Sequence, residues 1–191
     1  MFSTKLDNLA NMIIESEKNT VADKEIIVYG LKTAMAQMLG IITAVALGCL
    51  FELLWESLVF LISFSCIRKY VGGYHCKKAI HCYVMSSGIM VLVLFLVLMT
   101  PDWYMSPASL LILAVSIPVI LKFAPIGATN KPLDEVEKQH YRKMTLRNLT
   151  MECFITVSLL LVGLDHFAYM ISLGIALTAG VVVFQEISNK I

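Results

Sequence analysis

The chain has 191 residues, of which 58% are hydrophobic, and carries a net charge of +1. Its mean hydropathy of +0.78 exceeds that of a soluble domain, which is closer to half apolar. Because the excess lies in long runs, the composition excludes an ordinary soluble protein. It predicts an all-α integral membrane protein, with a single membrane-embedded domain over 1–191 and no nucleic-acid partner.

The first predicted element is amphipathic. Four apolar residues recur there at helical spacing: Phe2, Leu6, Leu9 and Ile13. Polar residues fill the other face, so residues 1–19 predict a helix that is too polar to span a bilayer and lies on its surface. An ordinary surface helix packed on the protein is the alternative. In either case the helix belongs to a cytoplasmic amphipathic region over 1–32, which is followed by a transmembrane bundle over 33–191.

The apolar stretch from Ala34 to Cys66 is too long for one span. As a single helix it would be about 50 Å long, whereas the hydrocarbon core is about 30 Å thick. Glu52 and Glu56 would lie near its middle, where an acid costs about 2.5–3.5 kcal/mol. We therefore expect a break near 51–56, which gives two short transmembrane helices.

Four further apolar spans follow, at 79–100, 107–124, 148–164 and 167–185. A turn with Trp103 and Tyr104 is expected between the first pair, since these aromatics favour the membrane–water interface. The short turn Asp165-His166 is expected between the last pair. The largest polar segment, 122–147, separates the pairs. The chain thus has about six transmembrane helices, the first two of which are short.

The basic residues support this arrangement. With the N-terminus in the cytoplasm, all fifteen lysines and arginines fall on the cytoplasmic side. The formal charges of the three outer turns are all acidic: Glu52, Glu56, Asp102 and Asp165. Such segregation is the positive-inside pattern of multi-pass proteins. It predicts that both termini are cytoplasmic.

Residues 68–87 read RKYVGGYHCKKAIHCYVMSS and concentrate reactive side chains between apolar stretches. Titratable and nucleophilic groups at a membrane boundary cost free energy and usually mark function. If this stretch were one helix, His75, Lys78, Cys82 and Ser86 would share a face. Lys78 would then lie one turn from Cys82, where its charge favours the thiolate, the nucleophilic form of cysteine.

A straight helix cannot make His75 the base for Cys82. Seven residues of helix separate the two by about 10 Å, and a general base must come within about 3 Å of the proton that it removes, or act through one water. The chain must therefore bend near 73–77. Gly72-Gly73 supplies the backbone freedom for that bend.

Other interpretations of this stretch remain open. His81 points about 100° away from Cys82 on a helix, and Cys76 faces elsewhere, so both rank below the first pair. The pattern HCxxxxHC also suits zinc, but one helical stretch cannot wrap a tetrahedral ion, so we expect no metal. A polar helix start with incidental thiols is the purely structural alternative. CxxC, GxSxG, HExxH and P-loop motifs are absent from the sequence, and no cofactor is expected.

The same stretch resembles the motif of the accessory gene regulator protein B (AgrB-like) family. The matching residues are Arg68, Gly72, Gly73, His75, Cys82 and Ser86. The downstream Ala124-Pro125 and the Asn-Lys-Pro sequence at 130–132 also resemble that family's signature in its basic loop. Length, polar N-terminus and span pattern agree over the whole chain.

The resemblance implies a membrane-embedded cysteine endopeptidase in the cell membrane of a Gram-positive bacterium. Members process a small precursor peptide into a cyclic autoinducer for quorum sensing. By resemblance, Cys82 is the nucleophile and His75 the base, with Ser86 at a recurrent family position. Lys78, Arg68 and the two glycines would support them, with backbone amides near the glycines as an oxyanion hole. A homodimer is the family expectation.

The polar segment from Lys122 to Arg147 carries six of the fifteen basic residues, and its 138–147 half holds no acid. We expect this half to attract the acidic C-terminal tail that precursors of the family carry. The residues concerned are Lys77, Lys78, Arg142, Lys143 and Arg147. Alternatively, these charges only set orientation and contact anionic head groups of the lipid bilayer. The competing function is a small six-helix carrier or a substrate-binding transporter subunit, which needs no nucleophile.

Overall fold

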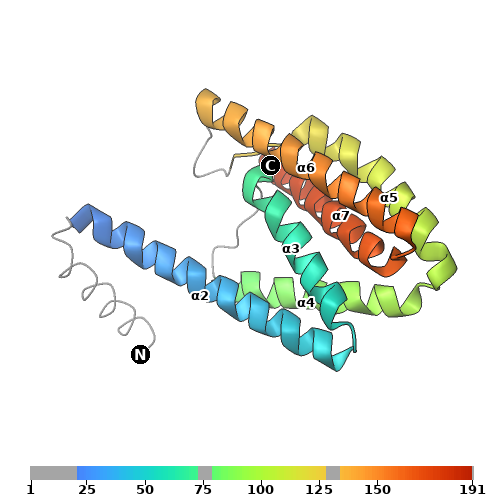
Figure 1. The fold of residues 1–191 in the computed structure, drawn as a ribbon. Coiled ribbons are helices and arrows are strands. Elements are labelled where there is room, and N and C mark those ends of the chain that lie inside the picture. Colours follow the sequence, from blue (N-terminus) through green and yellow to red (C-terminus); the bar gives the residue numbers. More distant parts are fainter. Residues whose placement is uncertain (1–20, 73–78, 128–133, 191) are drawn as a thin grey trace. The chain divides into compact units, whose positions relative to one another are not determined.

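The computed structural model describes residues 21–72, 79–127 and 134–190, which fold into helices (Figure 1). In chain order these are α2 (Val21–Leu50), α3 (Leu54–Val71), α4 (Ala79–Met99), α5 (Asp102–Phe123), α6 (Glu135–Val162) and α7 (Asp165–Ser188). The chain divides into two compact units, 1–43 and 44–191, and the division falls within α2. The amphipathic helix predicted for 1–19 lies outside the described residues.

Among the described residues, three helices are long and apolar enough to cross a membrane: α5, α6 and α7. Shorter apolar stretches run over Gln37–Leu50 in α2 and Tyr83–Met99 in α4. The prediction of an all-α membrane protein is confirmed. The number of spans and the side on which the termini lie stay predictions.

The predicted break in the long N-terminal apolar stretch is confirmed. α2 ends at Leu50, and Glu52 adopts a left-handed φ of 58°. Leu53 N donates to the Gly48 carbonyl at 2.8 Å, and Ser57 Oγ on α3 donates to the Ala44 carbonyl at 3.1 Å. These bonds satisfy carbonyls at the end of α2, so the chain reverses where the two glutamates made one continuous span costly.

Two predicted turns are wrong. Trp103 and Tyr104 do not form a turn, because α5 already begins at Asp102 and both aromatics lie in its first turn. Asp165-His166 likewise form no turn, because α7 begins at Asp165. In both places an acid occupies the first turn of a helix, where it interacts favourably with the helix dipole. The breaks between these helices lie slightly earlier, at 100–101 and 163–164.

The second half of the polar segment 122–147 is helical. Asp134 caps α6: its side chain accepts from Glu135 N at 2.7 Å, and its own N–H donates to Glu137 Oε2 at 3.3 Å. Such a capping box fixes the start of a helix. α6 then continues for 28 residues to Val162. The basic stretch 138–147 and the apolar stretch after it therefore belong to one helix.

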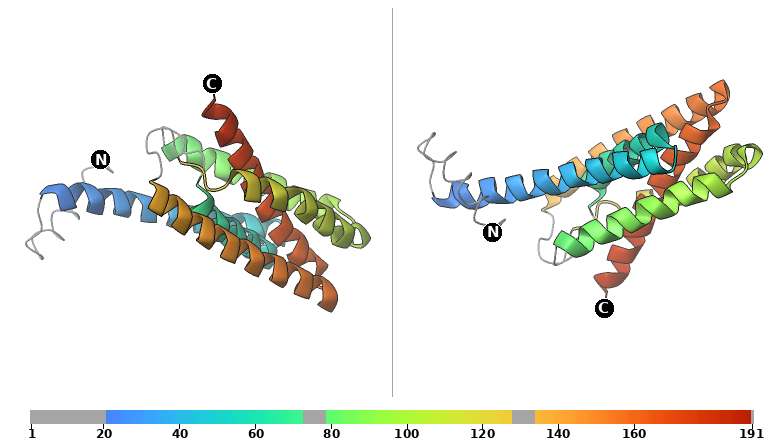
Figure 2. Two further views of the ribbon diagram at one scale, coloured as in Figure 1. Left: turned by 90° about the horizontal axis from the view of Figure 1, so that it is seen from above. Right: turned by 90° about the horizontal axis from the view of Figure 1, so that it is seen from below.

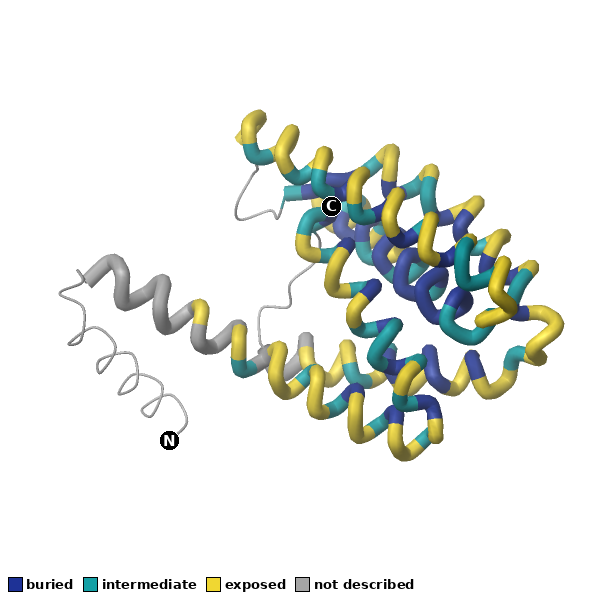
Figure 3. The backbone as a smooth tube through the Cα atoms, in the orientation of Figure 1, coloured by how far each residue is buried: buried dark blue, intermediate teal, exposed yellow. Residues whose placement is uncertain are grey.

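In the second unit, α7 is the most buried helix, and it packs against α3, α5 and α6 (Figures 1 and 2). The buried residues gather along it in Figure 3, and Met170, Ile175 and Val182 are fully buried. Many apolar side chains on the other helices are exposed, as expected where a helix faces lipid rather than protein.

A buried cluster lies where α3 and α5 end. It includes Ile67, Val71, Ile120, Ala124, Ile126 and Leu149. Since α3 leads directly into the segment of the predicted catalytic motif, this cluster supports the start of that motif.

Candidate functional site

The structure describes only part of the predicted catalytic motif. Residues 73–78 lie outside the described residues, and they include Gly73, His75, Cys76, Lys77 and Lys78. Cys82 and His81 belong to α4, but the description does not extend to their side chains. Ser86 is exposed on α4, one turn beyond Cys82 and therefore on the same face.

α3 ends before His75 and Cys82. α3 ends at Val71, and Gly72 follows with φ 79° and ψ −161°, which is not helical. α4 begins at Ala79. The predicted helix face through 75, 78, 82 and 86 can therefore be followed only from Cys82 onward. The bend predicted at 73–77 lies outside the description and stays a prediction.

Gly72 is held against a segment that is distant in sequence. It forms an isolated parallel bridge with Ile126, whose N–H donates to the Val71 carbonyl at 3.0 Å. A Cβ added to Gly72 would overlap the carbonyl oxygen of Ile126. The positive φ also disfavours any residue with a Cβ, by about 1–2 kcal/mol. Both the backbone conformation and the close contact therefore require glycine here.

The segment that contacts Gly72 is buried and hydrogen-bonded to α5. Ala124, Pro125 and Ile126 are all buried, and the peptide bond before Pro125 is cis. Ala124 N donates to the Ile120 carbonyl at 2.9 Å, which ties the segment to the last turn of α5. The fold thus joins the two stretches that carried the family resemblance. Sequence reasoning identified both but did not predict the contact of Ile126 with Gly72.

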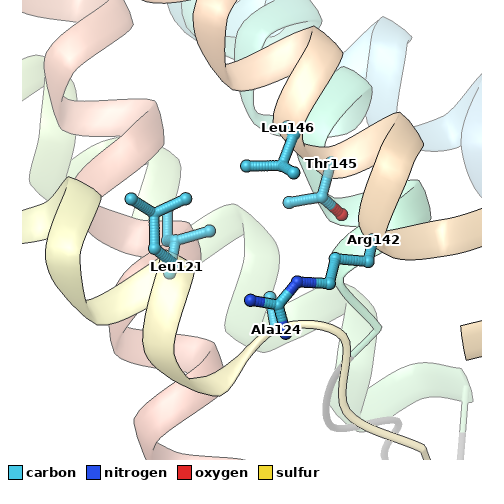
Figure 4. Close-up of a pocket in the computed structure, with 6 residues that line it drawn as sticks. Leu121, Ala124, Arg142, Thr145 and Leu146 are labelled. Atoms are coloured by element: carbon cyan, nitrogen blue, oxygen red, sulfur yellow. The ribbon is translucent and has the colours of Figure 1, made fainter. Parts of the chain in front are cut away.

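One of the predicted capture residues lies beside this segment. Arg142 of α6 lines a small pocket with Ile120, Leu121, Ala124, Thr145 and Leu146. In Figure 4 its guanidinium extends toward Ala124. Lys143 and Arg147 are exposed on the same helix. A guanidinium beside the end of α5 can bind an anionic group such as a carboxylate.

Arg68 takes a different position from these three residues. It lies in the last turn of α3, with its guanidinium 5.3 Å from the centre of the Phe64 ring. A cation–π contact of this kind stabilises an arginine on the helix surface. Arg68 therefore lies along α3, four residues before Gly72, and is not among the residues that line the pocket of Arg142.

Comparison with known proteins assigns the chain to a family. The model of the accessory gene regulator B family matches residues 6–185. The chain belongs to the accessory gene regulator B (AgrB) family. This AgrB-family chain is 32% identical over 162 residues to two proteins of Clostridium perfringens that are named as AgrB-like, from strains SM101 and 13. Each match covers 80% of this chain and 76% of the relative. No solved structure matches the chain.

Family membership gives the protein an AgrB-like role in the processing of a quorum-sensing peptide. It agrees with the apolar helices, which identify a membrane protein. Among the described residues, the features that bear on this role are Gly72, held against Ile126, and the pocket of Arg142 beside that segment.

The contact of Gly72 with Ile126 leads to a matched pair of variants. Gly72→Ala should lower peptide processing at least about tenfold, since the new methyl group must displace the segment that leads to His75. Gly163→Ala is the control: Gly163 also ends a helix, with φ 80°, but a Cβ there would meet open space. Processing rates of both variants at equal membrane levels test this. Equal losses would show that backbone strain alone is responsible.

Proposed function

We propose that this AgrB-family protein is a membrane-embedded cysteine endopeptidase that cleaves a precursor peptide and cyclises it to a thiolactone or lactone. The observation that supports the proposal is that Gly72, in the motif that resembles the family, is anchored to Ile126, next to the second stretch that resembles it. A histidine and a cysteine seven residues apart can form a working pair only where one helix does not carry both. The proposal therefore includes the predicted bend at 73–77, which brings His75 back toward Cys82.

In the proposed mechanism, His75 removes the proton from the Cys82 thiol. The thiolate attacks the carbonyl carbon of the scissile peptide bond, and backbone amides near Gly72-Gly73 stabilise the oxyanion. The C–N bond then breaks, and the imidazolium of His75 returns the proton to the departing amine of the tail. The rest of the peptide is left as an acyl-thioester on Cys82.

Ring closure completes the reaction. A cysteine thiol or serine hydroxyl within the bound peptide attacks the thioester carbonyl, and the bond to Cys82 sulfur breaks. The thiolate of Cys82 recovers the proton of the attacking group through His75. Because water competes with the internal nucleophile, the site must restrict water. Cys82 lies only a few residues inside α4, next to an apolar stretch, where such restriction is expected.

The same proposal assigns the cationic residues to substrate capture. Arg142, Lys143 and Arg147 on α6, with Lys77 and Lys78, would hold the acidic C-terminal tail of the precursor. The pocket of Arg142 supports this assignment, because it adjoins the segment that anchors Gly72. Held there, a tail would keep the bond that precedes it close to the motif.

The proposed location is the cell membrane of a Gram-positive bacterium, with both termini and the motif on the cytoplasmic side. The segregation of all fifteen basic residues to one side supports this orientation. A homodimer is part of the proposal on the family resemblance alone.

The test is to trap the acyl-enzyme. The candidate substrate is the peptide of a short reading frame beside the gene, with an amphipathic start, a central Cys or Ser and an acidic tail. Purified protein in liposomes should release the tail of this precursor. It should carry the remaining peptide on Cys82 as an adduct that hydroxylamine removes, seen by mass spectrometry. Failure to release a tail or form an adduct would contradict the proposal.

The same preparation separates a protease from a carrier. Alkylation of Cys82 should abolish tail release, whereas a six-helix carrier would largely keep binding its ligand after alkylation. Retained binding of the precursor without any cleavage by the unmodified protein would favour the carrier.

A further inference from the structure

A buried carboxyl group lies in the apolar part of α6 and takes no part in the proposed mechanism. Glu152 is only 6% exposed. Its Oε2 accepts a hydrogen bond from Ser63 Oγ of α3 at 2.5 Å. Its Oε1 is buried and has no partner among the described residues. An acid within a transmembrane segment is costly to bury and is therefore rarely without a role.

A second polar contact joins the same two helices. Asn148, one turn before Glu152 on α6, donates from Nδ2 to the backbone carbonyl of Cys66 at 3.0 Å. Cys66 lies one turn after Ser63 on α3. The rings of Tyr70 and Tyr141 extend the contact, with centroids 6.5 Å apart. The last two turns of α3 are thus joined side by side to α6.

α7 also packs closely against α3 at Ser63. A Cβ added to Gly174 of α7 would lie 2.8 Å from Ser63 Oγ and 3.3 Å from Phe64 N. This close approach requires the absence of a side chain at position 174. Small residues permit such approach between membrane helices. Ser63 is therefore held between the carboxyl group of α6 and the backbone of α7.

α3 links these contacts at Ser63 to Gly72 in the predicted catalytic motif. Nine residues of helix, about 13 Å, separate Ser63 from Gly72. Ile67 and Val71, which lie between them, are fully buried. Any rotation or sliding of α3 would therefore be transmitted to Gly72 and would disturb its close contact with Ile126.

We propose that Glu152 and Asn148 are positioning residues that set the rotation and height of α3, and through it the start of the motif that carries His75. This inference rests on the proposed endopeptidase function. Apolar contacts between membrane helices are weakly directional, whereas a buried hydrogen bond fixes one register. In lipid no water replaces a lost partner, so the register is lost when the bond is removed.

The kinetic test uses three variants in liposomes with the synthetic precursor peptide. Glu152→Ala should lower kcat about tenfold while KM changes less than about twofold, since the tail-binding residues are untouched. Glu152→Gln keeps an acceptor for Ser63 and should recover most of kcat. Met105→Ala is the control: Met105 is buried on α5 in the hydrophobic cluster that does not include the end of α3, and its truncation loosens packing without removing a side-chain hydrogen bond.

Two kinetic outcomes overturn the proposal. A loss of kcat in Met105→Ala equal to that in Glu152→Ala, at equal thermal stability, would reduce the role of Glu152 to general packing. Failure of Glu152→Gln to recover kcat would mean that the charge or proton of the carboxyl group matters, and that the bond to Ser63 does not.

A distance measurement separates this inference from the proposed function. Spin labels are placed at Lys69 of α3 and Gln139 of α6, both exposed, in protein without native cysteines. Their distance distribution should be narrow, broaden with Glu152→Ala and narrow again with Glu152→Gln. An unchanged distribution would overturn the positioning role even where cleavage occurs. If the expected broadening occurs but wild-type protein cleaves no precursor, the proposed function fails, and the role in that reaction fails with it.

Discussion

Replacement of Cys82 by alanine is expected to abolish precursor cleavage, with a loss of about 10⁴-fold or more. The thiolate is the attacking group in the proposed reaction, and without it no acyl-thioester can form. His75→Ala should cause a loss of similar size, because an unactivated thiol is a poor nucleophile near neutral pH. The double variant should be no worse than either single variant, since the two residues act as a unit. Tail release by liposome-embedded protein measures all three rates.

The chain supplies its own controls for this experiment. Cys76 and His81 are the same residue types, and each is adjacent in sequence to one of the proposed pair. Cys76→Ala and His81→Ala should retain substantial cleavage, and all variants should insert into the membrane at wild-type levels. An inactive Cys76→Ala together with an active Cys82→Ala would reverse the assignment of the nucleophile.

The coarse fold could be predicted because the thickness and low polarity of the bilayer limit the length and composition of its helices. Glu52 and Glu56 in a long apolar stretch had to lie near a break, and α2 does end at Leu50 before α3 begins at Leu54. The cost of burying two acids made this prediction independent of any detail of packing. Helix boundaries are less constrained. Trp103, Tyr104, Asp165 and His166 are helical, because polarity locates the water interface and does not require the backbone to stop its helix there.

The site was predictable only in its local part. The sequence indicated that Gly72 must free the backbone, and its φ of 79° agrees. It did not indicate that Ile126 would occupy the space beside it, because this contact joins residues 54 positions apart and depends on how α3 and α5 end together. An alternation of apolar residues or a motif spacing carries no information on such a contact.

The sequence does carry a signal for the role of Glu152, although it does not name the partner. An acid within the predicted span 148–164 is a candidate for a functional or positioning role on insertion cost alone. Its partner could not be read from the sequence, since Ser63 lies on α3, 89 residues away. Serine is also common in helices for other reasons. The structure supplies the pairing, and the pairing suggests the role.

Reversal of the three cationic residues Arg142, Lys143 and Arg147 to glutamate is expected to weaken precursor binding with little change in the chemical step. Exposed charge pairs contribute about 0.2–1 kcal/mol each. Loss of three attractions and their replacement by repulsion should thus raise KM about 10–100-fold at low salt. The effect should shrink as salt is added, because the residues are exposed and screening acts within about 10 Å at 0.1 M.

A compensating change in the substrate gives the decisive comparison. A precursor whose acidic tail residues are replaced by lysine should bind the reversed protein better than the original precursor does, and the wild-type protein worse. Lys190→Glu is the control for loss of positive charge, since Lys190 is exposed, pairs with Glu186 at 3.0 Å and is not among the residues that line the pocket of Arg142. Its KM should match that of the wild type.

Orientation in the membrane must be measured in the same variants, because the lost positive charges also contribute to the positive-inside pattern. Labelling of single introduced cysteines from each side of the vesicle reports this. Suppose that the reversed protein inserts correctly and processes precursor at the wild-type rate under sub-saturating, low-salt conditions. The three charges would then serve orientation alone, and the tail would be bound elsewhere. If instead KM rises and the lysine tail lowers it again, the basic half of α6 is where the acidic tail is held during cleavage.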